Sequence, residues 1–223
     1  MRSNPKIGKI ANPFKLKVSD LILLRKNLPT VNKDWEKRIY NDLKARIKNH
    51  YSFEQNDYCA YCRTQINFLG YNEPLEHIIL KDYRPEWMFE PLNIALSCDE
   101  CNTRKATKHT LRASYRKSNT FLTASNNYRI IHPHHDNFED HIKIIDDLFY
   151  QAITRDKGFI HILIFGLWHF QTLSKRARAL NISKRDHYFK IYYRLQQSVC
   201  TRHEKKALRT MTNRLIDRLT DPL

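Results

Sequence analysis

Apolar residues recur every four positions between residues 33 and 50, and this spacing predicts an amphipathic helix. The residues on its apolar face are Trp35, Ile39, Leu43 and Ile47. Lys, Arg and Asp fill the opposite face. We expect Asn32 to be the N-cap, because its side-chain oxygen can accept a hydrogen bond from a free amide of the first turn.

The pattern changes between residues 57 and 110, where apolar runs are short and turn residues are frequent. These runs predict strands near 75–79 and 93–97, joined by a loop at 80–91. A helix is expected to follow, from residue 102 to 108. The segment is therefore predicted to be a small unit of two strands and a helix.

From residue 138 onward the spacing of apolar residues is helical again. The expected helices are one around Ile142, Ile145 and Phe149 and three more at 158–180, 184–200 and 202–219. The most apolar run, residues 159–170, is too short for a bilayer, which needs about 20 residues. It therefore predicts a buried helix.

These elements predict an α+β fold that is mostly α, in three segments. The segments are an N-terminal helical extension at 1–56, the small two-stranded unit at 57–110 and a basic, helical C-terminal region at 111–223.

Positive charge dominates the composition, since 39 Lys and Arg against 23 Asp and Glu give a net charge of +16 over 223 residues. Such a surface binds polyanions by releasing counterions from phosphates, so nucleic acid is the expected partner. A basic surface that is merely solvated is the alternative. Residues 1–20 contain no apolar stretch followed by a small-residue cleavage site, so no signal peptide is predicted and the protein is expected to be cytoplasmic.

Four cysteines form two C-x-x-C pairs, Cys59 with Cys62 and Cys98 with Cys101. In a reducing cytoplasm such pairs indicate metal binding, because two of them supply the four thiolates of a closed, structural zinc site. A redox pair and a chance arrangement are the alternatives. Cys200 lies far from the others and is expected to be a buried free thiol.

A specific order of residues accompanies these pairs: Leu75-Glu76-His77-Ile78, then Asn93, then Cys98-x-x-Cys101-Asn102-x-x-Lys105. This order resembles the HNH endonuclease family, which has a ββα-metal fold, and most closely the branch whose core carries a four-cysteine zinc site. The resemblance covers residues 57–110, about a quarter of the chain. It implies a metal-dependent enzyme that hydrolyses phosphodiester bonds of DNA, with RNA left open as a substrate.

The resemblance also implies roles for single residues. Glu76 and Asn102 would bind Mg²⁺ or another divalent cation, which prefers oxygen ligands, and His77 would be the base that activates water. Asn93 would fix the loop that carries the histidine. Three positions depart from the common pattern. Glu76 replaces an aspartate, Leu80 stands where a proline is frequent, and Asn102 is a well-represented variant of the last histidine. A buried, satisfied His77 and a salt-bridged surface Glu76 are the alternatives.

Basic residues follow the last cysteine pair, with no acidic residue between 101 and 120. Those expected to contact the nucleic-acid backbone are Arg104, Lys105, Lys108, Arg112, Arg116 and Lys117. Such contacts add affinity and salt dependence without sequence preference.

A histidine-rich segment at 132–141 combines a Pro-containing turn with an acidic stretch. We expect Asp136 or Asn137 to cap the next helix, with a second metal site as the alternative. Residues 30–145 resemble the nuclease component of Septu and retron-associated phage-defence systems, and this implies an ATPase as a protein partner. The competing hypothesis for the whole chain is a non-catalytic, zinc-containing module that binds nucleic acid.

Overall fold

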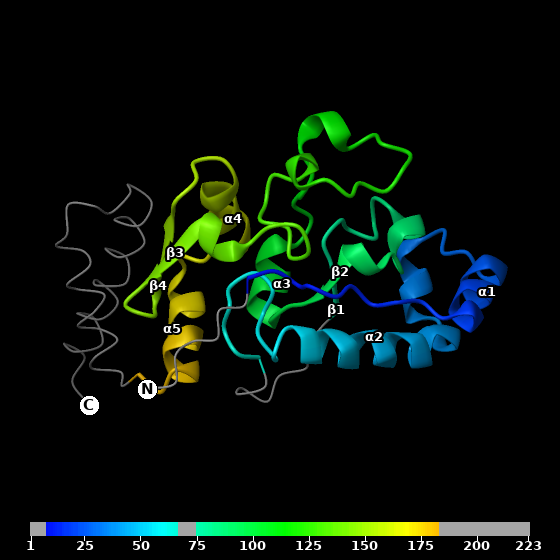
Figure 1. Ribbon diagram of the computed structural model, residues 1–223, viewed down its shortest axis with the longest axis horizontal. Helices are drawn as coiled ribbons and strands as arrows, with labels where there is room; N and C mark the ends of the chain where they lie inside the picture. Colours follow the sequence, from blue (N-terminus) through cyan, green and yellow to red (C-terminus); the bar gives the residue numbers. More distant parts are fainter. Residues whose placement is uncertain (1–7, 67–74, 183–223) are drawn as a thin grey trace, which may run out of the picture.

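The computed structural model describes residues 8–66 and 75–182, and this part of the chain has an α+β fold (Figure 1). Its helices are α1 (Val18–Lys26), α2 (Asn41–Glu54), α3 (Asp99–Lys105), α4 (Lys157–Phe165) and α5 (Phe170–Ala179). Its strands are β1 (Leu75–His77), β2 (Ile94–Leu96), β3 (Ile142–Ile145) and β4 (Phe149–Ala152). The strands form two antiparallel pairs, β1–β2 and β3–β4. Cys200 and the helices predicted at 184–200 and 202–219 lie outside the described residues.

Helix α2 begins at Asn41, so the predicted start near residue 33 is wrong, and Asn32 is not its N-cap. Asn32 instead opens a 3₁₀ turn. The carboxylate of Asp34 accepts the backbone amides of Thr30 (2.7 Å) and Val31 (3.2 Å), and this local hydrogen bonding competes with a regular helix. The apolar face of α2 is buried, and its buried residues are Leu43, Ile47 and Tyr51.

Both strands of the small unit are confirmed, as β1 and β2. Because β1 ends at His77, the regular alternation of side chains stops there, and Glu76 and His77 are both buried. Helix α3 begins at Asp99 rather than at residue 102. Asp99 and Glu100 place negative charge on its first turn, where the free amides favour it.

The helix predicted around Ile142 and Phe149 is wrong, because this segment forms the β3–β4 hairpin. Asp146 and Asp147 both have positive φ, 52° and 58°, which turns the chain back on itself. Aspartate adopts this conformation more readily than most residues. The apolar residues look helical in spacing because the turn interrupts the alternation of the two strands.

The single helix predicted at 158–180 is two helices, α4 and α5, separated at Gly166. Gly166 has φ +59°, the left-handed backbone of a helix C-cap. A side chain there would also crowd His169, since an added Cβ lies 2.8 Å from its Cδ2 atom. The expected buried helix is α4, whose Ile162 and Phe165 are buried. No helix in the described part of the chain is long and apolar enough to cross a membrane.

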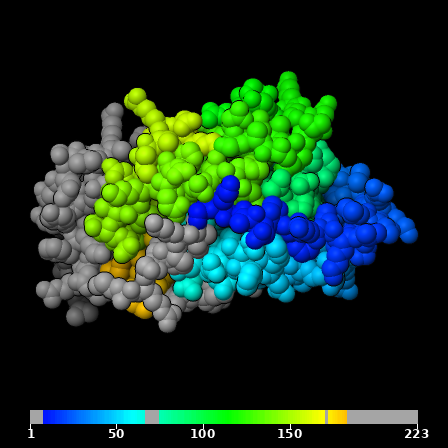
Figure 2. Space-filling view, in the orientation of Figure 1, coloured from blue at the N-terminus to red at the C-terminus, as the bar shows by residue number. Residues whose placement is uncertain are grey.

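One apolar core draws on all three predicted segments. Its members include Ile10, Tyr51, Ile94, Ile131 and Phe165. Figure 2 shows the N-terminal segment (blue) crossing the visible face between α2 (cyan) and later parts of the chain (green). There the amide of Ile10 donates to the carbonyl of Pro133 at 2.8 Å. The segment boundaries themselves stay predictions.

Gly158 provides a test of how α4 docks against the start of β3. An added Cβ there would lie 2.1 Å from the carbonyl oxygen of His141, a backbone atom that cannot rotate away. We predict that Gly158→Ala lowers the free energy of unfolding by about 1–3 kcal/mol, as overpacking does. Gly8→Ala is the control, since its Cβ would meet only the side chain of Asn137, at 3.2 Å. Urea unfolding measures both, and equal stability of the two variants would contradict this packing.

Candidate metal centre and acid–histidine site

The four cysteines predicted to bind zinc converge in the structure. Their Sγ atoms all lie within 4.8 Å of one another, and all four residues are buried. The Sγ atoms of Cys62 and Cys98 are 3.8 Å apart. A tetrahedral site with zinc–sulfur bonds of about 2.3 Å places its sulfurs about 3.8 Å apart, so the group fits a metal ion such as zinc.

Backbone amides surround the sulfur of Cys59. The amides of Tyr61 and Cys98 approach its Sγ atom at 3.4 Å and 3.3 Å. Arg63, with φ 55°, turns the chain so that its own amide donates to the Cys59 carbonyl at 3.0 Å. Donors around a sulfur stabilise its ionised form, which is the form that binds a metal.

The cluster requires a cation if its sulfurs are to be ionised together. Burial raises the pKa of the Cys101 thiol well above its ordinary value, since a buried thiolate loses its solvation. A soft-ligand site of four thiolates selects ions such as zinc, which bond the sulfurs directly and remove that penalty.

Side chains from the C-terminal region hold the first cysteine pair by its backbone. His161 in α4 donates to the Tyr61 carbonyl at 2.9 Å, and Tyr150 in β4 donates to the Cys62 carbonyl at 2.6 Å. Arg176 in α5, also buried, donates to the same Cys62 carbonyl at 3.2 Å. The sequence does not reveal these contacts, because a carbonyl acceptor leaves no residue signature.

Lys105 forms a buried ion pair with Glu76 next to the metal centre. The Lys105 ammonium binds Oε1 of Glu76 and also donates to the His77 carbonyl at 2.6 Å. Burial raises the pKa of Glu76, an effect that the charge of Lys105 opposes. Lys105 is 0% exposed, so the expectation that it contacts phosphate is corrected: its side chain points inward because Glu76 is buried there.

His77 is buried with one ring nitrogen engaged. Its Nε2 donates to the Met88 carbonyl at 3.1 Å, which leaves Nδ1 with the lone pair of the neutral ring. The ring edge packs on Trp35, with centroids 4.6 Å apart at 84°. Burial, together with the charges of Lys81 and Lys105, lowers the pKa of His77 to about 3, so the ring is neutral near pH 7.

Asn93 ties the chain after His77 to the end of the neighbouring loop. Its Oδ1 accepts the Ile79 amide at 2.7 Å, and its Nδ2 donates to the carbonyls of Ile79 and Trp87, both at 3.1 Å. The side chain is fully buried. Asn93 therefore fixes the segment that follows His77. The family resemblance implies a similar role for this residue.

Asn102 lies half-buried on α3, between Cys101 and the turn that carries Lys105. Residues three apart on a helix share a face, so Asn102 is on the side of α3 that Lys105 directs at Glu76. Its side chain makes no hydrogen bond with Glu76 or His77 among those described. The structure thus joins Glu76, His77 and Lys105 directly, and places Asn102 one turn from them through α3.

Three of the other predicted nucleic-acid contacts are tethered to the protein. Arg104 pairs with Glu100 at 2.8 Å, and Arg112 pairs with Asp156 at 3.0 Å. Lys108 donates to backbone carbonyls, one of them at 3.1 Å. Surface ion pairs of this kind are weak, so contact of these residues with nucleic acid stays a prediction.

Arg116 and Lys117 are exposed. Neither forms an ion pair with a carboxylate of residues 8–66 or 75–182. Their charges are therefore not offset by a salt bridge within the described structure.

Asp136 is buried in a hydrogen-bond network and caps no α-helix. It accepts from Lys157 (2.6 Å), from Ser125 (2.5 Å) and from the amide of His132 (2.7 Å). Asn137 precedes a 3₁₀ turn and makes no side-chain capping bond. The predicted cap is therefore wrong, because the carboxylate is needed to neutralise the buried lysine.

One histidine of the same segment supports β2. His134 donates through Nε2 to the Ile94 carbonyl at 2.8 Å. Within the described residues, the four cysteines are the only group of three or more His, Cys, Asp or Glu side chains close enough to share an ion. The alternative of a second metal site at residues 132–141 therefore has no support here.

No family model matches the chain, and no curated protein matches it either. The function is therefore inferred from the four-cysteine group and from the group formed by Glu76, His77 and Lys105.

The four-cysteine centre predicts the metal content of the protein. We expect the purified protein to contain about one zinc ion per chain, and Cys101→Ser to lose most of it and to unfold at a lower temperature, because a structural metal contributes directly to folding. Elemental analysis and thermal unfolding measure the two effects. Cys200→Ser is the control and should keep its metal. Equal zinc content in both variants would contradict the centre.

Asp136 makes a prediction about stability and pH. Asp136→Asn leaves Lys157 buried without a counter-charge and should lower the free energy of unfolding by about 3 kcal/mol. Burial raises the pKa of Asp136. The hydrogen bonds from Lys157, Ser125 and the His132 amide outweigh this effect and lower that pKa below 3.8.

The carboxylate therefore contributes its stability above pH 3.8 and loses it as the pH falls through its lowered pKa. The difference between wild type and Asp136→Asn should be constant from neutral pH to about pH 5 and shrink only under more acid conditions. Asp140→Asn, at an exposed position, is the control for urea unfolding at each pH. A difference that shrinks already near neutral pH would contradict this assignment.

Proposed function

We propose that this protein is an HNH-type endonuclease that hydrolyses phosphodiester bonds of DNA with a divalent cation such as Mg²⁺. The observation that carries the proposal is the arrangement of β1, β2 and α3. β1 ends in Glu76-His77, β2 pairs with it, and α3 carries Asn102 directly after a cysteine of the metal centre. This order supports the proposal of a ββα-metal core. Zinc in the cysteine centre would be structural, since the protein supplies all four ligands.

In this mechanism His77 would accept the proton from water. Its pKa is lowered to about 3, so it is a weak base, and the divalent cation would also have to lower the pKa of the attacking water. The neutral ring offers Nδ1, while the Met88 carbonyl and Trp35 fix the plane of the ring. Asn93 holds the next segment of chain, so the ring keeps its place when a substrate arrives.

Glu76 and Asn102 are the oxygen ligands that would hold the catalytic cation. A divalent ion there supplies Lewis acidity and stabilises the charge on the leaving oxygen. Lys105 pairs with Oε1 of Glu76, which favours the ionised carboxylate against the effect of burial and fixes its direction. Lys105 is thus a positioning residue in this mechanism rather than a phosphate contact.

The resemblance to phage-defence nucleases extends the proposal to a cytoplasmic protein that acts together with an ATPase. The Pro-containing turn and acidic stretch at 132–141, with the zinc-linked core, are its support.

A non-catalytic nucleic-acid-binding module is the second candidate, and one observation favours it. Glu76 is already ion-paired with Lys105, and His77 is 5% exposed with one nitrogen bonded to a carbonyl. These contacts give both residues a structural role without any chemistry. The two candidates differ in whether His77 affects cleavage.

Cleavage of supercoiled plasmid tests the proposal. Wild-type protein should nick or linearise DNA when Mg²⁺ or Mn²⁺ is added, and His77→Ala should cut at least about 100-fold more slowly, because a general base contributes a factor of that order. His77→Ala should unfold at a lower temperature, because it removes a buried ring that packs on Trp35. It should keep its zinc and stay folded at the assay temperature, which separates loss of chemistry from loss of fold.

His50→Ala is the matched control. His50 hydrogen-bonds the backbone of Asn12 through Nε2. It lies outside the acid–histidine site, which is Glu76, His77 and Lys105, so this variant should cut at the wild-type rate. Equal cutting by wild type and His77→Ala would refute the proposed mechanism. Binding of DNA by both proteins without cutting by either would favour the second candidate.

A further inference from the structure

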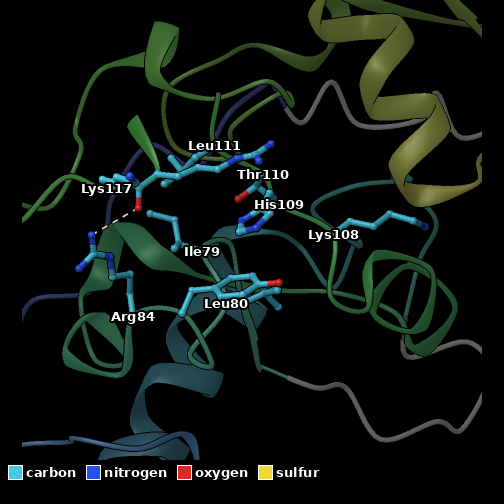
Figure 3. Close-up of a pocket in the computed structure, with 10 residues that line it drawn as sticks. Ile79, Leu80, Arg84, Lys108, His109, Thr110, Leu111 and Lys117 are labelled. Atoms are coloured by element: carbon cyan, nitrogen blue, oxygen red, sulfur yellow. Dashed lines mark hydrogen bonds between the residues drawn. The ribbon is translucent and has the colours of Figure 1, made fainter. Parts of the chain in front are cut away.

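A cavity of about 360 Å³ opens beside the chain that follows β1 (Figure 3). Ile79 and Leu80 line one side of it, only two and three residues beyond His77. Ile79 is held by Asn93, and the Thr110 hydroxyl donates to the carbonyl of Ile78 at 2.7 Å. The cavity is therefore fixed to the same segment as the acid–histidine site.

Two stacked rings form part of the cavity wall. Tyr83 and His109 have ring centroids 4.2 Å apart and planes inclined by 17°. The Tyr83 hydroxyl donates to the Thr107 carbonyl at 3.1 Å, and the residue is 45% exposed. Burial, with the charges of Arg116 and Arg129, lowers the pKa of His109 and so favours its neutral ring. An exposed aromatic ring held in place in this way is a platform for another flat ring.

The charged residues of the wall are all cationic. Arg84 is tied to the carbonyls of Arg116 and Ser118, and in Figure 3 Lys108 extends away from the other lining residues. Arg116 and Lys117 are exposed and have no ion pair in the described part of the chain. Among residues 8–66 and 75–182, no carboxylate lines the cavity. The lining therefore favours an anion beside an aromatic platform.

We propose that this cavity is a subsite for one unpaired nucleotide of single-stranded DNA. The base stacks on Tyr83, and Arg116 and Lys117 bind the adjoining phosphates. The volume lies at the low end of ligand pockets, which suits one nucleotide rather than a duplex. Bases within a duplex are stacked on each other and cannot present a face to Tyr83. The inference rests on the proposed affinity for nucleic acid but not on hydrolysis.

Fluorescence anisotropy of a short labelled DNA strand, with no divalent cation added, tests the subsite. Tyr83→Ala should weaken binding of the single strand about tenfold, and binding of the same strand annealed to its complement less than about twofold. Tyr83→Phe, which keeps the ring and removes the hydroxyl, is the matched control and should bind as the wild type does. Thermal unfolding of both variants should match the wild type, since Tyr83 is half exposed.

The two phosphate-binding cations have a separate readout. Replacing Arg116 and Lys117 with alanine should reduce the slope of log affinity against log salt by about 0.7 for each phosphate of the single strand that the variant no longer neutralises. Competition with free deoxyadenosine monophosphate distinguishes a strand from a small ligand, and the monophosphate should displace the strand only in large excess.

Unchanged binding of the single strand by Tyr83→Ala would overturn the subsite, as would an equal loss for strand and duplex. Tight binding of the monophosphate alone would reassign the cavity to a free nucleotide. Because the assay reads binding only, failure of the subsite leaves the cleavage result of His77→Ala untouched, and a protein that never cuts DNA can still show it.

Discussion

One ion shared by four buried sulfur atoms would join parts of the chain that lie far apart in the sequence. β1 and β2 pair over only three residues each, and a two-stranded sheet of that length is not stable by itself. The sulfurs of Cys59 and Cys62 come from before these strands, and those of Cys98 and Cys101 from directly after them. Because the strands are antiparallel, the start of β1 and the end of β2 lie at the same end of the pair, where Leu75 faces Leu96. An ion in the cysteine centre would therefore hold that end, and His77 lies at the opposite end, beside Ile94.

Helix α3 connects the cysteine centre to the acid–histidine site. Over seven residues it carries a cysteine ligand, Asn102 and Lys105, and Lys105 reaches Glu76 on β1. A short helix fixed at both ends has little freedom to tilt. The cysteine centre and the Glu76 carboxylate therefore keep a constant separation. A buried lysine paired with a buried glutamate is costly to separate, and this cost keeps α3 against β1.

Local signals in the sequence predict the two strands and the two C-x-x-C pairs, because each depends on residues close together in the chain. The role of Asn93 follows from the family resemblance instead. The direction in which a side chain points is harder to predict. A lysine three residues after Asn102 can face solvent or core, and only the burial of Glu76 decides that Lys105 faces inward. The hairpin at β3–β4 is missed because the positive φ of Asp146 and Asp147 leaves no trace in hydrophobic spacing. The support from Tyr150, His161 and Arg176 is missed because it crosses much of the chain.

The contacts of Tyr150, His161 and Arg176 limit how the cysteine motif could be transferred to another protein. Tyr150 and Arg176 meet at one carbonyl, that of Cys62, and His161 meets the carbonyl before it. A fragment cut at the limits of the recognisable motif would expose these carbonyls and the apolar surface under α4. The first cysteine pair thus depends on β4, α4 and α5 for its support, and an engineered chimera would have to include Tyr150, His161 and Arg176 as well as the cysteines.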